Sequence, residues 1–331
     1  MQFSYTTHIL QLRHPFQISK GSRTEQPTVI VHLSDGTYTG YGEAPAIRYY
    51  GQSVERTVEL LDILRPTIET HTFTTPAVFF DYLSPEVNAH PFVQAALDVA
   101  AYDLYARQRG VPMGQLWGSA TEPAPLTSFT IGLGSVADMR AKIRATPWPI
   151  YKIKLGTSDA TGLIRALREV TDSVFRVDAN EAWTAAQTIS YAKALRPLHV
   201  EFIEQPLPAA DWAGMREVMR HSCLPLIADE SCQTEADIAR CQGHFHGVNI
   251  KLSKCGGLTP ALRMITAARS AGLQVMAGCM VESTVGVAPL AHLLPRLDYV
   301  DMDGPLLIQN DPATGMTISA GRVRIGEVQL R

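Results

Sequence analysis

Eight short apolar segments recur through the later two thirds of the chain, and their regular spacing constrains the fold more than any other feature. A helical pattern follows each segment, and the residues at or near the segment ends are 22 to 28 positions apart. These residues are Thr130, Lys154, Asp178, Glu204, Asp229, Lys251, Cys279 and Asp301. A period of this length fits a strand, a loop, a helix and a return loop, which predicts repeated βα units in a parallel sheet.

Eight parallel strands close most simply into a (β/α)₈-type barrel. An open, doubly wound sheet is the alternative, but no glycine-rich nucleotide-binding motif follows the first strand. The first third of the chain differs: residues 28–33 and 37–42 flank a Ser-Asp-Gly turn and predict a hairpin, and residues 92–109 are helical. We expect an α+β domain over 1–118, a barrel over 119–309, and a two-stranded tail over 310–331 that returns to the first domain.

Composition limits the class of function. The net charge of −3, from 29 Lys and Arg against 32 Asp and Glu, offers no basic surface for nucleic acid or anionic lipid. Five cysteines without a CxxC pair favour reduced thiols. The polar first residues are unlike a signal peptide, and no stretch of roughly 18 apolar residues predicts a membrane span. We therefore expect a cytoplasmic enzyme, and assembly into a homo-oligomer is compatible with the sequence.

Three acidic residues end neighbouring strands of the predicted barrel. Asp178, Glu204 and Asp229 close the third, fourth and fifth strands, at the edge where barrel enzymes carry their chemistry. Three converging carboxylates repel one another and require protons or a cation. Oxygen ligands favour Mg²⁺ or Mn²⁺ over Zn²⁺. The alternative is a structural network in which these acids pair with Lys or Arg.

Two lysines end strands that lie four apart, so they face each other across the barrel mouth. Lys154 closes the second strand and Lys251 the sixth. Lys152 shares the face of Lys154, and its positive charge would lower the pKa of that neighbour. Two bases on opposite sides of a carbon can remove a proton from one face and return it to the other, as a racemase or epimerase requires. A Schiff-base lysine, as in a class I aldolase, is the competing use.

Asp301 and Asp303 end the eighth strand, and their spacing places both carboxylates on one face. Strand eight lies opposite strand four in such a barrel, hence opposite the predicted metal. A pair of acids there attracts a cationic group such as an ammonium. A second metal site or a solvated turn are the alternatives.

Motifs along almost the whole chain resemble the enolase superfamily, in its muconate-lactonizing subgroup, and most closely the dipeptide epimerases. In the barrel they are KIKLG at 152–156, VDANEAW at 177–183, EQPLP at 204–208, ADES at 228–231, NIKLSKCGGLT at 249–259, GCMVES at 278–283 and DMDGP at 301–305. In the N-terminal domain they are GSRTE at 21–25 and GYGEA at 40–44. The DxD of strand eight is the feature that favours the dipeptide epimerases.

The resemblance implies an α+β capping domain that closes over a modified (β/α)₇β barrel. It implies one Mg²⁺ per subunit, with Mn²⁺ as a substitute, on the three strand-end carboxylates. It also implies Lys154 and Lys251 as the acid/base catalysts, and we assign Lys251 rather than Lys254 because it ends the strand. The substrate would be a dipeptide that epimerises at its C-terminal residue through an enediolate, with its ammonium at Asp301 and Asp303.

Arg23 lies in the segment SKGSRTEQ of the capping domain, where a guanidinium can hold a side-chain carboxylate. It predicts a glutamate side chain, as in L-Ala-D/L-Glu epimerases of murein peptide recycling, and Lys20 is a second candidate. Thr130 and Lys152 complete the predicted substrate-binding residues, and Glu282 is assigned no role. The alternatives are a dipeptide epimerase of hydrophobic or cationic specificity, a cycloisomerase, o-succinylbenzoate synthase or N-acylamino-acid racemase, and a non-catalytic barrel.

Overall fold

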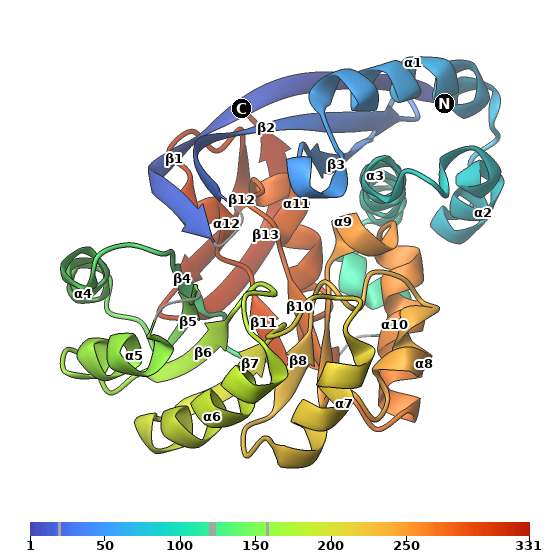
Figure 1. Ribbon diagram of the computed structural model, residues 1–331. Helices are drawn as coiled ribbons and strands as arrows, with labels where there is room; N and C mark the ends of the chain where they lie inside the picture. Colours follow the sequence, from blue (N-terminus) through green and yellow to red (C-terminus); the bar gives the residue numbers. More distant parts are fainter. Residues whose placement is uncertain (19–20, 119–123, 157–158) are drawn as a thin grey trace.

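The computed structural model describes residues 1–331 except 19–20, 119–123 and 157–158 (Figure 1). It confirms the predicted fold class. An N-terminal part built on an antiparallel sheet lies over one end of a nearly closed barrel of eight parallel strands. Within the described ranges, no helix combines the length and the apolar composition that crossing a lipid bilayer demands.

Three antiparallel strands in the order β1-β2-β3 form the N-terminal sheet; α1 and α3 pack on it, and α2 packs on α3. The bounds are β1 (Gln2–Ile18), β2 (Gly21–Ser34), β3 (Thr39–Pro45), α1 (Val54–Thr70), α2 (Pro76–Val87) and α3 (Pro91–Arg109). Helix α3 approaches β3 so closely that a Cβ on Gly42 would collide with the carbonyl of Ala96. The short helix η1 (Arg48–Tyr50) reaches the barrel, because the Tyr49 hydroxyl donates to Glu181 at 2.9 Å.

Eight strands pair in chain order to make the barrel. They are β4 (Phe129–Ile131), β5 (Ile150–Lys154), β6 (Val174–Asp178), β7 (Val200–Glu204), β8 (Leu226–Ala228), β9 (Gly247–Ile250), β10 (Gln274–Gly278) and β11 (Tyr299–Asp301). A parallel bridge between Thr127 and Val300 brings the first and last strands together. The main apolar core lies between the strands and the surrounding helices, where Ile153, Phe175 and Val177 are completely buried.

Helices follow the first seven strands and cover the outside of the barrel (Figure 1). They are α4 (Val136–Ala145), α5 (Ala160–Arg168), α6 (Ala185–Leu195), α7 (Trp212–His221), α8 (Asp237–Cys241), α9 (Leu252–Cys255), α10 (Leu258–Ser270) and α11 (Thr284–Ala291). Three short 3₁₀ helices are η2 (Met113–Trp117), η3 (Arg196–Leu198) and η4 (Leu294–Arg296). Only a four-residue helix, α12 (Gly304–Leu307), follows β11, which makes the arrangement (β/α)₇β.

The strand register aligns the ends of adjacent strands. Lys154 of β5 pairs with Asp178 of β6, and Asp178 pairs in turn with Glu204 of β7. On the other side of the barrel, Gly278 of β10 pairs with Asp301 of β11. The charged residues that end these strands therefore lie in one layer at the C-terminal edge, beneath η1. This is the edge where barrel enzymes assemble their active sites.

The C-terminal strands β12 (Ala313–Ser319) and β13 (Arg322–Leu330) form a separate antiparallel hairpin. At its turn, the carbonyl of Gly321 accepts from the backbone N–H of Thr127 at 2.9 Å. Near its end, Glu327 pairs with Arg107 of α3 at 2.7 Å. The hairpin thus contacts both the barrel and the N-terminal part. We propose the division into residues 1–118, 119–309 and 310–331; residue 119, where the barrel would begin, lies outside the described residues.

Two buried carboxylates of the N-terminal part bind the starts of barrel helices. Glu43 of β3 accepts from the backbone N–H groups of Ser283 and Gly286, both at 3.0 Å, at the start of α11. Asp98 of α3 accepts from the backbone and hydroxyl of Thr259, at 2.8 and 2.7 Å, at the start of α10. Negative charge at a helix N-terminus is favourable, so these contacts fix the N-terminal part over the barrel.

Candidate active site

A cavity of about 100 Å³ lies at the C-terminal mouth of the barrel, under the N-terminal part. Both parts of the chain line it, so it exists only when they are docked together. Eight of the ten predicted site residues line the cavity: Arg23, Thr130, Lys152, Lys154, Asp229, Lys251, Asp301 and Asp303. The other two, Asp178 and Glu204, are predicted metal ligands that do not line it.

The three predicted metal ligands come together as an acidic cluster. Oxygen atoms of Asp178, Glu204 and Asp229 lie within 4.8 Å of one another, and all three side chains are buried. Asp178 and Glu204 end β6 and β7, and Asp229 directly follows β8. The sequence predicted that these three strands are neighbours. Their convergence at the bottom of the barrel mouth meets the geometric requirement for shared ligation of one cation.

Burial and neighbouring charges shift the pKa values of the cluster in different directions. Burial, reinforced by the charge of Asp178, raises the pKa of Glu204 to about 7. Burial also opposes ionisation of Asp178, but Lys154 and Lys152 outweigh it and lower its pKa to about 2. Oε2 of Glu204 lies 2.9 Å from the ammonium of Lys152 but has no aligned hydrogen bond. Three buried carboxylates, one of which has an oxygen without a hydrogen-bond donor among the described residues, fit a hard divalent cation.

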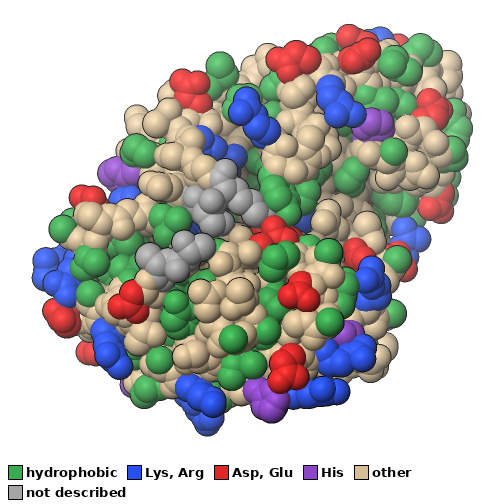
Figure 2. All heavy atoms as spheres, in the orientation of Figure 1, with side chains coloured by type: hydrophobic (Ala, Val, Ile, Leu, Met, Phe, Trp, Pro, Cys, Tyr) green, Lys and Arg blue, Asp and Glu red, His purple; other side chains and the backbone are tan. Residues whose placement is uncertain are grey.

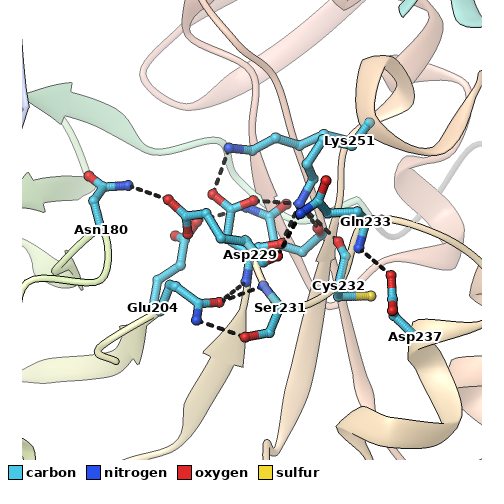
Figure 3. A network of polar contacts seen from close by, with 12 residues as sticks. Asn180, Glu204, Asp229, Ser231, Cys232, Gln233, Asp237 and Lys251 are labelled. Atoms are coloured by element: carbon cyan, nitrogen blue, oxygen red, sulfur yellow. Dashed lines mark hydrogen bonds and ion pairs between the residues drawn. The ribbon is translucent and has the colours of Figure 1, made fainter. Parts of the chain in front are cut away.

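The two predicted catalytic lysines approach the cluster from opposite sides. Lys154 of β5 binds Asp178 at 2.6 Å, and Lys251, the residue after β9, binds Asp229 at 2.8 Å. Figure 3 shows Lys251 among the contacts of Asp229. The sequence led us to expect lowered lysine pKa values. Burial is the largest single effect at Lys251 and acts in that direction, but the charges of Asp229 and Glu204 and the hydrogen bond to Asp229 together raise its pKa.

Lys251 and Lys254, both in the motif NIKLSKCGG, have different surroundings. Lys254 is almost fully buried, and its ammonium donates to Oδ1 of Asp229 at 2.6 Å and to the carbonyls of Cys232 and Asn249 at 3.0 and 3.3 Å. Lys254 does not line the cavity, whereas Lys251 does. This difference supports the choice of Lys251 as the residue that faces the substrate.

Sequence reasoning assigned no role to two amides that order the cluster. Gln205, at φ 35°, accepts from the backbone N–H groups of Asp229 and Ser231, both at 3.0 Å. Asn249 of β9 donates to Oε1 of Glu204 at 2.9 Å. Two sequence signals could have identified them. Gln205 directly follows the strand-end ligand Glu204, and Asn249 lies two positions before Lys251, on the same strand face.

Asp301 and Asp303 lie at the same strand end but have different partners. Asp301 binds Lys152 at 3.0 Å, whereas Asp303 accepts from the backbone N–H of Thr130 at 2.6 Å. Burial and the charge of Asp301 raise the pKa of Asp303 to about 8. Lys152 connects this strand end to the metal cluster, because its ammonium contacts Asp301 and Glu204 at once.

Arg23 lies on β2 at the upper wall of the cavity. Its guanidinium donates to Gln26 and sits 5.8 Å from the centre of the Phe16 ring. Burial lowers the pKa of Arg23, and within the described part of the chain no carboxylate pairs with it. A half-buried cation of this kind favours an anionic partner. The second candidate, Lys20, lies outside the described residues.

Comparisons with known proteins agree with this geometry. Residues 3–118 match the family model "Mandelate racemase / muconate lactonizing enzyme, N-terminal domain", and residues 135–326 match "Enolase C-terminal domain-like". An L-Ala-D/L-amino acid epimerase of Maribacter sp. is 49% identical over 327 residues, which cover 99% of this chain and 95% of the relative. An L-Ala-D/L-Glu epimerase of Bacteroides thetaiotaomicron is 35% identical over 333 residues, which cover 99% of this chain and 86% of the relative.

Among solved structures, a dipeptide epimerase from Enterococcus faecalis V583, complexed with Mg and the dipeptide L-Leu-L-Tyr, superposes with a TM-score of 0.91. It is 27% identical, and the match covers 99% of this chain and 97% of that one. The similarity therefore extends over both parts of the chain and includes the way in which they are docked.

Proposed function

The chain belongs to the enolase superfamily, in its mandelate racemase and muconate lactonizing enzyme family, and we propose on this premise that it is a Mg²⁺-dependent dipeptide epimerase. It is an isomerase that inverts the configuration of the C-terminal residue of a dipeptide by moving one proton. Two relatives of this chain, at 49% and 35% identity, carry epimerase names.

One observation carries the proposal: two lysines from opposite strands flank one small cavity, each next to an acid of the metal cluster. Lys154 reaches the cavity from β5 and Lys251 from β9. A substrate carbon held between them presents one face to each lysine. One lysine, as the neutral amine, can then take the α-proton, while the other, as the ammonium, supplies a proton to the opposite face.

We propose that Asp178, Glu204 and Asp229 hold one Mg²⁺ per subunit, with Mn²⁺ as a substitute. The buried Oε2 of Glu204, which accepts no hydrogen bond from the described residues, and the all-oxygen donor set support this assignment. When bound, the ion supplies positive charge that stabilises the enediolate charge on the substrate carboxylate as the α-proton leaves. Asn249 and Gln205 fix the orientation of two of these ligands, so that the cluster need not reorganise.

The other end of the substrate needs a site for its ammonium. Asp303 is buried, lines the cavity, and has no Lys, Arg or His partner within the part of the chain that the structure describes. An ammonium near it would relieve the repulsion that raises its pKa. Thr130 holds the carboxylate of Asp303 through its backbone N–H. Asp303 and Asp229 of the metal cluster line the same cavity, which suits a substrate with both a carboxylate and an amine.

The direct test is proton NMR in D₂O with L-Ala-L-Glu and Mg²⁺. We expect the glutamate α-proton signal to disappear while a second diastereomer forms, because each return delivers solvent deuterium. A chain inactive towards L-Ala-L-Glu and a panel of other dipeptides would contradict the function. Activity on N-acylamino acids instead would favour another reaction of the superfamily.

We propose a glutamate as the reacting residue, because Arg23 is a half-buried cation at the cavity wall. Replacing Arg23 by Met should lower kcat/KM for L-Ala-L-Glu about 100-fold, since the side-chain carboxylate loses its charged partner. The value for L-Ala-L-Leu should stay unchanged or rise. The exposed Arg109 at the end of α3 offers a matched control, and Arg109→Met should alter neither substrate.

Equal losses for both dipeptides in the Arg23→Met variant would remove Arg23 from side-chain recognition. A broader specificity is then the better description. The Maribacter relative is called an L-Ala-D/L-amino acid epimerase, and apolar side chains of Phe16, Ile47 and Val281 also line the cavity. These surfaces would contact hydrophobic substrate side chains.

We propose that the protein works in the cytoplasm, in the recycling of murein peptides, with a small dipeptide as its partner rather than nucleic acid or membrane. The five cysteines are free thiols, which agrees with a reducing compartment. Basic and acidic side chains alternate over the face drawn in Figure 2, so that face carries no extended basic patch for nucleic acid. We also propose that the protein assembles into a homo-oligomer. Size-exclusion chromatography with light scattering tests this.

A further inference from the structure

Residues 251–257, which we call the lysine turn, follow β9 and begin with Lys251. The carbonyl of Lys251 accepts from the backbone N–H of Cys255 at 3.1 Å. The carbonyl of Leu252 accepts from the backbone N–H groups of Gly256 and Gly257 at 3.1 and 2.9 Å. Because these hydrogen bonds close the turn on its first two residues, a shift at the glycines also moves Lys251.

Helix α3 of the N-terminal part packs on this turn through α9 (Figure 1). Both glycines have a positive φ, 97° at Gly256 and 119° at Gly257. A Cβ on Gly256 would lie 2.9 Å from Oε1 of Gln94, and a Cβ on Gly257 would collide with the carboxylate of Asp98. Only glycine permits this close approach, so the backbone of the turn rests directly on α3.

Asp98 also binds the residue that follows the lysine turn by two positions. Its Oδ2 accepts from the backbone N–H of Thr259 at 2.8 Å, and its Oδ1 accepts from the hydroxyl of Thr259 at 2.7 Å. Asp98 is buried, which strengthens these contacts because water does not compete for them. Burial raises the pKa of Asp98 to about 7, and the hydrogen bonds from Thr259 act against that rise. One side chain of α3 therefore fixes the position of the turn.

The other predicted base is held in a different way. Lys154 lies within β5 and pairs in register with Asp178 of β6, so the sheet itself fixes its backbone. Lys251 lies one residue beyond the end of β9 and precedes the four-residue helix α9. The position of Lys251 thus depends on the lysine turn, whereas that of Lys154 depends on strand pairing.

We propose that Asp98 is a positioning residue, which holds the lysine turn so that Lys251, and not Lys154, is aligned with the reacting carbon. The inference rests on the proposed dipeptide epimerase function and deepens it, because one of the two bases is aligned only when α3 is docked on the barrel. Docking of the N-terminal part thus closes the cavity and completes the pair of bases together.

Hydrogen exchange of each dipeptide diastereomer in D₂O separates this role from a general loss of structure. The diastereomer that Lys251 deprotonates is the one that Lys251→Met no longer exchanges. Asp98→Ala should slow exchange of this diastereomer about 100-fold, as expected for a base displaced by roughly 1 Å. Exchange of the other diastereomer should stay within about threefold of the parent rate. Epimerisation needs both lysines and should fall with the slower exchange.

Two further variants test the same contact with smaller changes. Thr259→Val keeps the shape of the side chain and removes only the hydroxyl that donates to Asp98, so it should give the same selective loss at about tenfold. Gly257→Ala acts from the opposite side, because its Cβ would displace the carboxylate of Asp98. It should show the same selectivity for the diastereomer of Lys251.

Amide hydrogen exchange measured by mass spectrometry gives a readout that does not depend on turnover. Peptides that cover the lysine turn should exchange about tenfold faster in Asp98→Ala, because the turn loses its contact with α3. Peptides that cover β5 should exchange as in the parent protein. A selective change of this kind is not expected if the variant merely unfolds more often as a whole.

Glu43 provides the matched control for loosened docking, because it is a buried acid of the N-terminal part that binds the start of α11 rather than the lysine turn. Glu43→Gln should slow exchange of the two diastereomers to the same extent. Asp81 is exposed on α2, and Asp81→Ala should behave like the parent protein.

Equal losses for the two diastereomers in Asp98→Ala, or unchanged amide exchange in the lysine turn, would overturn the proposal. A parent protein inactive towards dipeptides would defeat the proposed function. In that case amide exchange would still decide whether Asp98 holds the lysine turn.

Discussion

Replacing either Lys154 or Lys251 by Met should abolish epimerisation of L-Ala-L-Glu, with a loss on the order of 10³-fold in kcat. Methionine keeps the length and apolar stem of lysine but removes the group that carries the proton. Inversion needs a proton acceptor on one face of the α-carbon and a donor on the other. Neither lysine can replace the other, because they reach the cavity from β5 and β9 on opposite sides.

The two variants should differ in the hydrogen exchange that they retain. In D₂O, the lysine that remains can still remove an α-proton from its own face and return deuterium to the same face. Each variant should therefore exchange one diastereomer of the dipeptide without inverting it, and the two variants should select opposite diastereomers. Proton NMR of L-Ala-L-Glu and L-Ala-D-Glu, each incubated separately, measures this directly.

Lys193 supplies the control for this experiment, because it is exposed on α6 and does not line the cavity. Lys193→Met should behave like the parent protein. If both site variants exchanged the same diastereomer, one of the lysines would act on the orientation of the substrate rather than on its proton. Retained epimerisation in either variant would contradict the two-base mechanism.

Removal of divalent metal should reduce turnover at least about 10³-fold, because uncompensated charge on the substrate carboxylate would oppose loss of the α-proton. EDTA treatment followed by gel filtration should give an inactive protein, and Mg²⁺ or Mn²⁺ should restore the NMR signal of the second diastereomer. Calorimetry should also show a higher thermal midpoint with metal. At a free metal concentration of 100 times Kd, binding should stabilise the folded protein by about 2.7 kcal/mol.

Asp229→Asn should mimic metal removal and should not respond to added Mg²⁺, since Asp229 has a carboxylate within 4.8 Å of the other two ligands. Asp211 caps α7 at the protein surface, and Asp211→Asn should keep both activity and its dependence on metal. Full activity of the EDTA-treated parent protein would show that the lysines around the cluster neutralise it without a cation.

The sequence was informative where structure depends on local periodicity. The period near 25 residues arises because each βα unit must cross the barrel once and return, and this identified the barrel and the eight strand ends. Alternation along a strand placed Lys152 and Lys154 on one face. The strand register then aligned Lys154, Asp178 and Glu204, as neighbouring positions in consecutive strands require.

Tertiary structure decided how the side chains share their partners. Lys152 joins acids from β6, β7 and β11, and its charge changes which of them remains ionised. The upward shift in the pKa of Lys251 depends on Asp229, 22 residues earlier in the chain, and could not be derived from the lysine alone. Gln205 and Asn249 gained roles only because adjacent strand ends meet.

The sequence by itself therefore determined the repeating architecture, the strand-end residues and the chemistry that their types allow. The folded chain decided which acid faces which cation, which of Lys251 and Lys254 faces the cavity, and which of Asp301 and Asp303 has a counter-charge. The physical reason is range. Strand and helix periodicity are set by neighbouring residues, whereas charge pairing in a buried site depends on ångström-scale distances between residues far apart in the chain.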